Sequence, residues 1–454
     1  MKIHLIAIGG AAMHNLAIAL KLNGHEVTGS DDEIFEPSRS RLKRYNLLPE
    51  NEGWNPAAIT GDIDLIILGM HARADNPELL KAKSLNLKIY SYPEFLYHHS
   101  INKQRIVIGG SHGKTTITAM VMHVLKYYGK NFDYIVGSKL NDFEVMVRLS
   151  DDAPVMIFEG DEYLSSAVDR RPKFHWYHPH IALLSGIAWD HINVFPTFEN
   201  YKQQFVRFIE LIENNGSLIY NKLDSVLRNI VNSKPNNKIE YIPYNIPKYS
   251  ISDGITGIEE NGKVYPLKIF GKHNLQNLKG AQLVCEKTGI TSNDFLKAIT
   301  SFEGASNRLE PVFKNDDIIV FKDFAHAPSK LKATVDAVKE QFAGKNIIAC
   351  FELHTFSSLN ENFLKQYKNS IDGADKASVF YSKHALKMKR LKMLDKNLIK
   401  DSFSRADLDV FDDIDDLKRW ITQNTGKNSV LLMMSSGNFN GLDIKKLVQQ
   451  LSKR

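Results

Sequence analysis

The sequence predicts an α/β protein of three domains, because strand-like and helix-like segments alternate along most of its 454 residues. Short apolar runs bounded by glycine or polar residues indicate buried strands, and apolar residues spaced three and four apart indicate amphipathic helices. The length also exceeds what a single hydrophobic core usually serves. We place the domain boundaries where the chain turns polar or its pattern changes, which gives residues 1–100, 101–308 and 309–454.

The first domain begins with a βαβ unit in which a glycine turn joins a strand to a helix. Its segments are strand Ile3–Ile8, turn Gly9–Ala12, helix Met13–Leu22, strand Glu26–Gly29 followed by Ser30 and Asp31, and strand Asp64–Leu68. An acid after the second strand is typical of Rossmann-like nucleotide-binding domains. Ala7 and Ala12 stand where the dinucleotide fingerprint requires glycine, so a nucleotide-containing substrate is favoured over a redox cofactor.

The second domain opens on a phosphate-binding loop, Gly110-Ser111-His112-Gly113-Lys114-Thr115-Thr116. The strand-like run Ile106–Ile108 precedes it, and a helical pattern follows it as far as Gly129. Backbone N–H groups in such a turn, together with the helix N-terminus, attract an anion. The lysine is placed for the terminal phosphates of a nucleotide and the first threonine for Mg²⁺. The usual motif has glycine at Ile108, but the flanking elements still predict a P-loop-type nucleotide domain.

Acidic residues follow two later strands of this domain. Glu159 comes after the strand Pro154–Phe158, and Asp190 and His191 come after Ile181–Leu184. Because ligands bind at the carboxyl ends of parallel strands, these side chains point to a metal site beside the phosphates. A helix-cap role for Glu159 and a buried, hydrogen-bonded role for His191 are the structural alternatives, and the adjacent phosphate loop favours the metal.

The rest of the chain predicts a hairpin, a helix and a third α/β domain. The hairpin strands are Ile255–Ile258 and Val264–Ile269, and the helix begins near His273. The strands of the third domain are Ile318–Phe321, Ile347–Phe351, Ser378–Tyr381 and Val430–Met434, and a helix through Ile444 and Leu451 closes the chain. The domain is Rossmann-like in its alternation of strands and helices.

Composition excludes several classes of protein. The two cysteines cannot form a disulfide framework, and no run of 18 apolar residues predicts a membrane span. A net charge of +6 is weak support for nucleic-acid binding, and the basic run Lys387–Lys392 lacks interleaved aromatic residues, which favours a solvated helix face. We therefore expect a cytoplasmic protein that binds neither nucleic acid nor membrane.

Several motifs occur in the order and spacing found in the Mur ligases, which this chain resembles over its whole length. They are Gly110–Thr116, Glu159, Asp190-His191, Gly271–Asn277, Arg308–Glu310 and Asp323–His326. Each motif is weak alone, but six in sequence are specific. Mur ligases are ATP-dependent enzymes that build the cell-wall peptide onto UDP-N-acetylmuramate. The resemblance therefore implies ATP and Mg²⁺ as cofactors, UDP-N-acetylmuramate and an amino-acid or peptide acceptor as partners, and no obligate protein partner.

The resemblance also implies roles for individual residues. For ATP they are Gly110, Ser111, His112, Gly113, Lys114, Thr115, Thr116, Asn274, Asn277, Arg308 and Asp323. For Mg²⁺ they are Thr115, Glu159 and His191, and for catalysis Lys114, Glu159, His191 and His326. For the two other substrates they are Gly10, Ala11, Ala12, Met13, Ser30, Asp31, Arg171, Lys173 and His354. The implied chemistry transfers the γ-phosphate of ATP to the muramoyl carboxylate, and an amine then displaces phosphate from the acyl phosphate.

Two acceptors fit the family pattern. Segments around Tyr163, Arg171, Lys173 and Asn438 are similar to members that attach the intact tripeptide L-Ala-γ-D-Glu-meso-diaminopimelate during peptidoglycan recycling. The alternative is free L-alanine, in de novo synthesis. Members that attach alanine usually have arginines where this chain has Thr355 and Ser358, and a lost arginine removes a bidentate partner for a carboxylate. We therefore predict the tripeptide.

Other features bear on this interpretation. Ala327 replaces a second histidine after His326, and Ala188 replaces an acid before Asp190. A non-catalytic, nucleotide-regulated binding protein is the alternative from a different class, and intact Lys114, Glu159 and His191 disfavour it. We expect Lys114→Ala to remove most ATP turnover and to leave the fold intact, on the assumption that Lys114 is an exposed loop residue.

Overall fold

The computed structural model describes residues 1–138, 140, 143, 145–166, 168–189, 194–304 and 308–451. They form two compact units, one of Met1–Asn245 with Gln276–Ile299 and the other of Ile246–Leu275 with Thr300–Arg454. Four β-sheets occur in this part of the chain, and helices connect most of their strands. The predicted α/β class is therefore confirmed.

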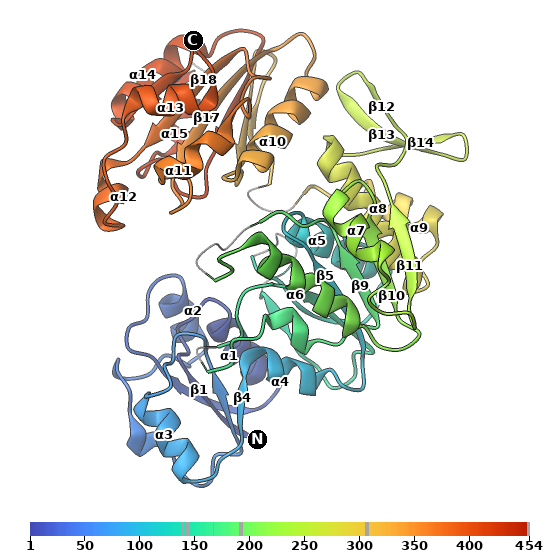
Figure 1. The fold of residues 1–454 in the computed structure, drawn as a ribbon, viewed down its shortest axis with the longest axis vertical. Helices are drawn as coiled ribbons and strands as arrows, with labels where there is room; N and C mark the ends of the chain where they lie inside the picture. Colours follow the sequence, from blue (N-terminus) through green and yellow to red (C-terminus); the bar gives the residue numbers. More distant parts are fainter. Residues whose placement is uncertain are drawn as a thin grey trace. The chain divides into compact units, whose positions relative to one another are not determined.

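The N-terminal sheet of the first unit has parallel strands in the order β2-β1-β3-β4. Its strands are β1 (Lys2–Ile6), β2 (Glu26–Ser30), β3 (Leu65–Leu68) and β4 (Ile89–Ser91). Its helices, drawn in blue in Figure 1, are α1 (Met13–Leu22), η1 (Pro56–Ala58), α2 (Ser38–Arg44), α3 (Pro77–Ser84) and α4 (Tyr92–His99). The register pairs Ile6 with Ser30, so the turn after β1 lies next to Asp31 at the carboxyl edge of the sheet.

A seven-stranded sheet forms the centre of the first unit, in the order β11-β10-β9-β5-β8-β6-β7. Its strands are β5 (Gln104–Gly109), β6 (Asp133–Ile135), β7 (Val147–Arg148), β8 (Val155–Glu159), β9 (Ile181–Leu184), β10 (Ser217–Asn221) and β11 (Glu240–Tyr244). All neighbouring pairs are parallel except β6 and β7. The apolar run Ile106–Ile108 is fully buried within β5, as expected for a central parallel strand.

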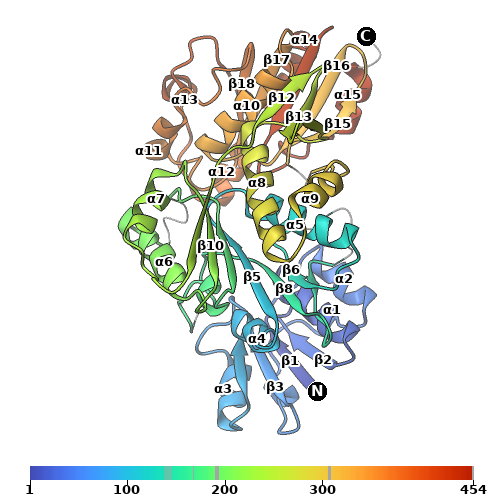
Figure 2. The ribbon, with the colours of Figure 1, turned by 90° about the vertical axis from the view of Figure 1, so that its right-hand side faces the viewer.

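The helices of the central sheet lie on both of its faces. They are α5 (Lys114–Tyr127), η2 (Lys173–Trp176), α6 (Phe198–Glu210), α7 (Ser225–Asn232), α8 (Lys272–Lys287) and α9 (Ser292–Ile299). Figure 2 shows α6 and α7 on one side and α5 and α9 on the other. The division between the two units falls inside α8, after Leu275.

The second unit contains the predicted hairpin within a three-stranded antiparallel sheet of β12 (Tyr249–Ser252), β13 (Ile255–Glu260) and β14 (Lys263–Pro266). Glu260 pairs with Lys263, and the two residues between them, Asn261 and Gly262, have φ angles of 52° and 75°. Asparagine followed by glycine is the usual sequence of such a two-residue turn.

The large sheet of the second unit has the order β15-β16-β20-β17-β18-β19, and only the β15–β16 pair is antiparallel. Its strands are β15 (Glu310–Lys314), β16 (Ile318–Asp323), β17 (Asn346–Leu353), β18 (Lys376–Tyr381), β19 (Asp409–Phe411) and β20 (Ser429–Met434). Each predicted strand of this domain is found, extended by one to three residues. Since the five strands from β16 to β19 are parallel, the residues that follow them gather at one edge.

Helices cover both faces of this sheet, and each face has its own apolar cluster. They are α10 (Pro328–Gln341), α11 (Glu361–Leu364), η3 (Lys365–Tyr367), α12 (Lys383–Met388), α13 (Lys396–Phe403), α14 (Ile414–Asn424) and α15 (Ile444–Leu451). Leu331 of α10 and Ile399 of α13 pack on one face, and Leu417 of α14 and Leu447 of α15 pack on the other. No helix within the described ranges has the length and apolar character needed to cross a membrane.

Candidate functional site

The phosphate loop joins β5 to α5 and depends on two glycines. Gly110 and Gly113 have φ angles of +115° and +82°, a region that favours glycine. A Cβ atom would collide with the Ser185 side chain at Gly110 and with the Asn277 amide at Gly113. The Ser185 hydroxyl donates to the backbone carbonyl of His112, which holds the loop against the end of β9. The shape of the loop therefore requires glycine at both positions, because neighbouring side chains leave no room for a Cβ atom.

Lys114 is the first residue of α5, and its ammonium is paired with an acid. Nζ donates to Oε2 of Glu162 at 2.5 Å, and the side chains of Lys114 and Glu162 are 16% and 1% exposed. Burial acts to lower the pKa of Lys114, but the carboxylates of Glu162 and Asp161 raise it overall, so the side chain stays a cation. The expectation that Lys114 is an exposed loop residue is wrong, because its side chain is only 16% exposed and is paired with Glu162, in the segment after β8.

A chain of hydrogen bonds extends this pair across the loop. The Tyr201 hydroxyl of α6 donates to Oε1 of Glu162 at 2.9 Å and lies 2.9 Å from the Ser111 hydroxyl. The backbone N–H of Ala188 donates to the same Ser111 oxygen at 2.9 Å. Neither Glu162 nor Tyr201 is among the residues predicted from the motifs. Glu162 follows other acidic residues after β8, and Tyr201 lies on the buried, mostly apolar face of α6. A hydroxyl on that buried face was the available signal, because a buried Tyr O–H usually has a partner.

Thr115 and Glu159 lie together at the start of α5. The Thr115 hydroxyl donates to Oε1 of Glu159 at 2.6 Å, and the backbone N–H of Gly137 donates to Oε2 at 2.8 Å. Hydroxyl and carboxylate oxygens are the donors that Mg²⁺ takes, so these residues fit the ion implied by the sequence. Asp190 and His191 lie outside the described residues. Within the described part of the chain, no group of three or more His, Cys, Asp or Glu side chains has the arrangement of a metal site.

The two cations predicted for substrate, Arg171 and Lys173, both have acidic partners. Lys173 Nζ donates to Oδ2 of Asp161 at 2.8 Å. Burial acts to raise the pKa of Asp161, but the nearby cations Lys173 and Lys114 lower it to about 2. Arg171 makes two bonds to Asp169, at 2.9 and 3.0 Å, and its guanidinium lies 4.0 Å from the centre of the Trp176 ring. Lys173 therefore belongs to the charged surroundings of Lys114, whereas Arg171 forms an exposed pair.

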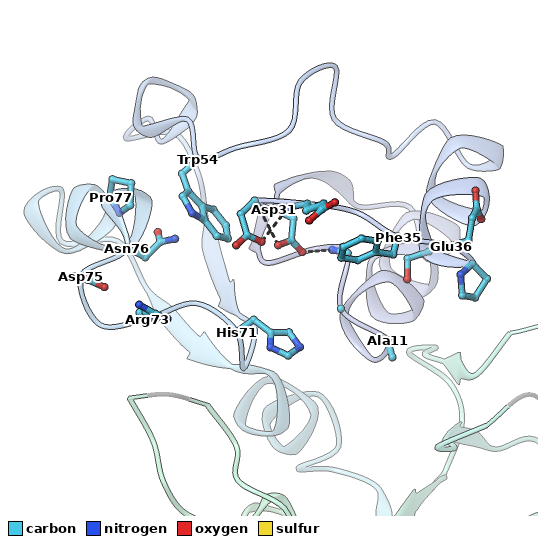
Figure 3. A pocket seen from close by; sticks show the side chains of 16 residues that line it. Ala11, Asp31, Phe35, Glu36, Trp54, His71, Arg73, Asp75, Asn76 and Pro77 are labelled. Carbon is cyan, nitrogen blue, oxygen red and sulfur yellow. Dashed lines mark hydrogen bonds between the residues drawn. The ribbon is translucent and has the colours of Figure 1, made fainter. Parts of the chain in front are cut away.

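A cavity of about 910 Å³ opens at the carboxyl edge of the N-terminal sheet. Of the six residues predicted for this domain, three line it, Gly10, Ala11 and Asp31; the others, Ala12, Met13 and Ser30, do not. The lining also contains Phe35, Trp54, His71 and Arg73, none of which the sequence analysis identified. Figure 3 shows Phe35 and Trp54 on opposite sides of Asp31. The cavity therefore offers aromatic faces around a central acid.

Asp31 is buried, and its carboxylate accepts a hydrogen bond from the backbone N–H of Gly9 at 2.7 Å. Burial, reinforced by the neighbouring Asp32, raises the pKa of Asp31 to about 7. Ser30, by contrast, points into the protein, where its hydroxyl donates to the fully buried carboxylate of Glu78. The backbone N–H of Asn55 donates to the same carboxylate at 2.6 Å. Ser30 thus anchors the end of β2, whereas Asp31 lines the cavity.

In the second unit, Asn274 and Arg308 line a smaller cavity of about 210 Å³. Asn274 donates to the carbonyl of Phe270 at 2.9 Å, and the Arg308 guanidinium lies 4.6 Å from the centre of the Phe324 ring. Asp323 is buried and accepts hydrogen bonds from two backbone N–H groups and from a threonine: Leu309 at 3.0 Å, Phe324 at 2.9 Å and Thr334 at 2.5 Å. Asn277, also predicted for the nucleotide, belongs to the first unit.

His326 and His354 follow β16 and β17, two parallel strands of the large sheet that β20 separates. His326 lies 2.9 Å through Nδ1 from the carbonyl of Phe324, just before α10. His354 lies 3.8 Å through Nδ1 from the carboxylate of Glu352, which is 2% exposed. The Ser435 hydroxyl and the backbone N–H of Phe439 donate to that carboxylate. Glu352 therefore joins the loop after β20 to His354, a link that the sequence analysis missed.

Three family models match the chain in order. The Mur ligase family catalytic domain matches residues 2–104, the Mur ligase middle domain residues 108–285, and the Mur ligase glutamate ligase domain residues 307–437. The three matches confirm the predicted organisation in three domains. The boundaries proposed after residues 100 and 308 stay predictions.

Individual relatives cover most of the chain. A UDP-N-acetylmuramate–L-alanine ligase from Caldicellulosiruptor bescii is 32% identical over 393 residues, 83% of either chain. A UDP-N-acetylmuramate–L-alanyl-γ-D-glutamyl-meso-2,6-diaminoheptandioate ligase from Haemophilus influenzae is 28% identical, covering 75% of this chain and 77% of that protein. The solved UDP-N-acetylmuramate–alanine ligase from Thermotoga maritima shares the fold, with a TM-score of 0.68, 23% identity and coverage of 100% and 99%.

Proposed function

The chain belongs to the Mur ligase family, and on this premise we propose that it joins the carboxylate of UDP-N-acetylmuramate to the amine of an amino acid or peptide at the expense of ATP. It is an enzyme of the ATP-dependent ligase class, which forms C–N bonds. The observation that carries the proposal is the loop after β5, where Lys114 and the Thr115–Glu159 pair lie together at the N-terminus of α5.

The proposed reaction activates the muramoyl carboxylate before the amide bond forms. A carboxylate oxygen is a poor leaving group, so the muramoyl carboxylate first takes the γ-phosphate of ATP and releases ADP. The acceptor amine then attacks the acyl carbon, an amide bond forms, and inorganic phosphate leaves. Such phosphoryl transfer depends on positioning and on charge stabilisation, and Lys114 supplies a fixed positive charge. Thr115 and Glu159 would hold Mg²⁺, which adds positive charge beside the phosphates when bound.

The two cavities support a proposed placement of the substrates. The Asp31 cavity, with Phe35 and Trp54, would take the uridine part of UDP-N-acetylmuramate, because flat aromatic faces accept a base and a carboxylate accepts ribose hydroxyls. Asn274 and Arg308, which line the smaller cavity of the second unit, are the proposed contacts of that unit's own residues with the nucleotide. His326 and His354 would face the acceptor at the carboxyl edge of the large sheet.

The relatives support L-alanine as the acceptor better than the tripeptide that the sequence motifs predict. The 32% identical relative is an L-alanine ligase, whereas the tripeptide relative matches a smaller share of the chain at 28% identity. The tripeptide is kept as a second candidate because of one feature of this chain: Thr355 and Ser358 hydrogen-bond to each other at 3.0 Å, where alanine-attaching members are expected to have arginines.

An acceptor panel tests the proposed function. Purified protein with ATP, Mg²⁺ and UDP-N-acetylmuramate is given L-alanine, L-Ala-γ-D-Glu or the tripeptide, and ADP and the ligated product are both measured. We expect ADP release only when the muramoyl substrate and an acceptor are both present. Binding of ATP with no ADP release from any combination would instead identify a nucleotide-regulated binding protein and refute the proposal.

A further inference from the structure

Residues 383–394, here called the basic segment, follow β18 at the carboxyl edge of the large sheet. Leu386 and Leu394 are buried in the apolar cluster of that face, and the Tyr381 hydroxyl donates to the carbonyl of Leu394 at 3.1 Å. Helix α12 ends at Met388, so the expected solvated helix face is only partly correct. The residues after Met388 form a loop in which Leu394 is buried. Figure 1 shows α12 set apart from the other helices of this unit.

One cation of this segment, Lys383, has an acidic partner, and four others have none in the part of the chain that the structure describes. Asp412 pairs with Lys383 at 2.7 Å and with Lys396 at 2.8 Å. Asp395 caps α13 by accepting two backbone hydrogen bonds. Across the described residues, no ion pair with an acid involves the four remaining cations, which are Lys387, Lys389, Arg390 and Lys392. Four positive charges close together in the sequence, at the carboxyl edge of the sheet, favour a ligand that carries more than one negative charge.

An exposed aromatic ring connects this segment to the predicted acceptor residue. Phe356 is 61% exposed, and Lys389 Nζ lies 4.6 Å from the centre of its ring. Phe356 comes two residues after His354, on the loop that follows β17. His354 in turn lies beside Glu352, which holds the loop after β20. The four cations therefore follow a strand at the same sheet edge as His354, and Lys389 contacts the Phe356 ring on the loop that begins with His354.

We propose that Lys387, Lys389 and Arg390, with Phe356, bind the distal carboxylates of a peptide acceptor. This inference rests on the proposed function and specifies its acceptor. L-Alanine has a single carboxylate, next to its reacting amine. The tripeptide has three further along its chain. The farthest lies more than about 10 Å from that amine when extended, since three residues alone span about 3.5 Å each and the γ-linkage and the diaminopimelate side chain add to this. A subsite for the distal carboxylates would select the longer acceptor even though the protein has no arginines at Thr355 and Ser358, near the reacting amine.

The test separates distal from proximal recognition. Lys389→Gln, Arg390→Gln and the double variant remove charge and leave a polar, somewhat shorter side chain. Lys383→Gln is the matched control on the same helix, since Asp412 already neutralises Lys383, and Lys445→Gln is a control on α15. We measure KM and kcat for the tripeptide, L-Ala-γ-D-Glu, L-alanine, ATP and UDP-N-acetylmuramate, together with thermal unfolding.

We expect each single change to raise KM for the tripeptide about 2- to 5-fold, and the double change about 5- to 25-fold, as for solvent-exposed ion pairs. KM for L-alanine, ATP and UDP-N-acetylmuramate stays the same, as do the controls. In the unmodified enzyme, tripeptide KM also rises between about 0.05 M and about 0.5 M salt, and the double variant loses most of that dependence.

Three outcomes would overturn the inference. The first is an unchanged tripeptide KM in the double variant. The second is an equal loss for tripeptide and L-alanine. The third is an unmodified enzyme that ligates L-alanine but not the tripeptide, which leaves the proposed function in place. Absence of ADP release with every acceptor would remove the proposed function itself.

Discussion

Replacing Lys114 should affect stability as well as catalysis. The ammonium is 2.5 Å from Glu162, whose side chain is only 1% exposed. Lys114→Met therefore leaves a buried carboxylate without its cation, although the Tyr201 hydroxyl still donates to it at 2.9 Å. Removing one partner of a buried ion pair usually costs about 3–5 kcal/mol. Because Lys114 keeps 16% exposure, we expect the lower end, about 3 kcal/mol off the free energy of unfolding.

The companion variants separate charge from packing. Glu162→Gln should cost less, about 1–2 kcal/mol, because Lys114 keeps the charges of Asp161 and Glu159 nearby. The double variant Lys114→Met/Glu162→Gln leaves no buried charge, so its stability should return to within about 1 kcal/mol of the unmodified protein. The coupling energy of this cycle should be about 3–5 kcal/mol in favour of the pair. None of the three variants that alter the pair should keep normal ATP turnover.

Urea unfolding, with hydrogen exchange in α5 as a local readout, measures these differences. Comparison is valid where the dependence on urea is the same for all variants, so that only the midpoint shifts. Lys222→Met, an exposed lysine with no part in this network, is the control for loss of a charge. Equal stability of Lys114→Met and the unmodified protein would refute the buried-pair argument. Recovery of ligation in the double variant would refute the role of Lys114 in phosphoryl transfer.

Three further predictions follow from other parts of the site. The pKa of Asp31 is raised to about 7, so its ionisation destabilises the fold as pH rises from about 4 to 7. Asp31→Asn should therefore raise the free energy of unfolding by up to about 4 kcal/mol at pH 8 and by little at pH 4. A gain that is the same at both pH values would contradict this. Thr115→Ala and Glu159→Gln should each raise the Mg²⁺ concentration needed for half-maximal ADP release by at least about 10-fold. An unchanged Mg²⁺ titration would exclude them as ligands. Gly113→Ala should lower the free energy of unfolding by about 1–3 kcal/mol and abolish nucleotide binding, because φ is +82° and the new methyl group meets Asn277. Calorimetric titration with ATP tests this, and normal affinity would mean that the loop tolerates a side chain.

The features predicted from sequence were those encoded locally. The helix Met13–Leu22 has the predicted bounds, and the phosphate loop has its strand and helix where expected. Both depend on residues within about ten positions of one another, so periodicity and glycine placement suffice. Ala7 shows the limit of motif matching. It replaces a fingerprint glycine yet has a φ of 69°, so the backbone keeps the left-handed turn without the residue that favours it.

The missed residues act through partners far along the chain. Glu162 meets Lys114 across 48 positions, Tyr201 meets Glu162 across 39, and Ser435 meets Glu352 across 83. No local pattern specifies which strand ends come together, because that depends on the order of strands in the sheet. The parallel order brings the acids after β8 to the start of α5. Sheet topology, rather than any motif, therefore selected the partners of the motif lysine.

The acids around the phosphate loop bear on how a nucleotide would bind. Lys114 and Lys173 are each paired with a carboxylate, Glu162 and Asp161. The nearby acids raise the pKa of Lys114 despite its burial, so its ammonium stays charged. A phosphate that approaches Lys114 must replace or share Glu162, so part of its attraction is offset by the bond it weakens. The same acid fixes the lysine in place before ligand arrives, which lowers the ordering cost of binding. Glu162→Gln should therefore separate the two effects: tighter ATP binding with slower phosphoryl transfer means that positioning is its main role, and weaker binding with an unchanged transfer rate would contradict that.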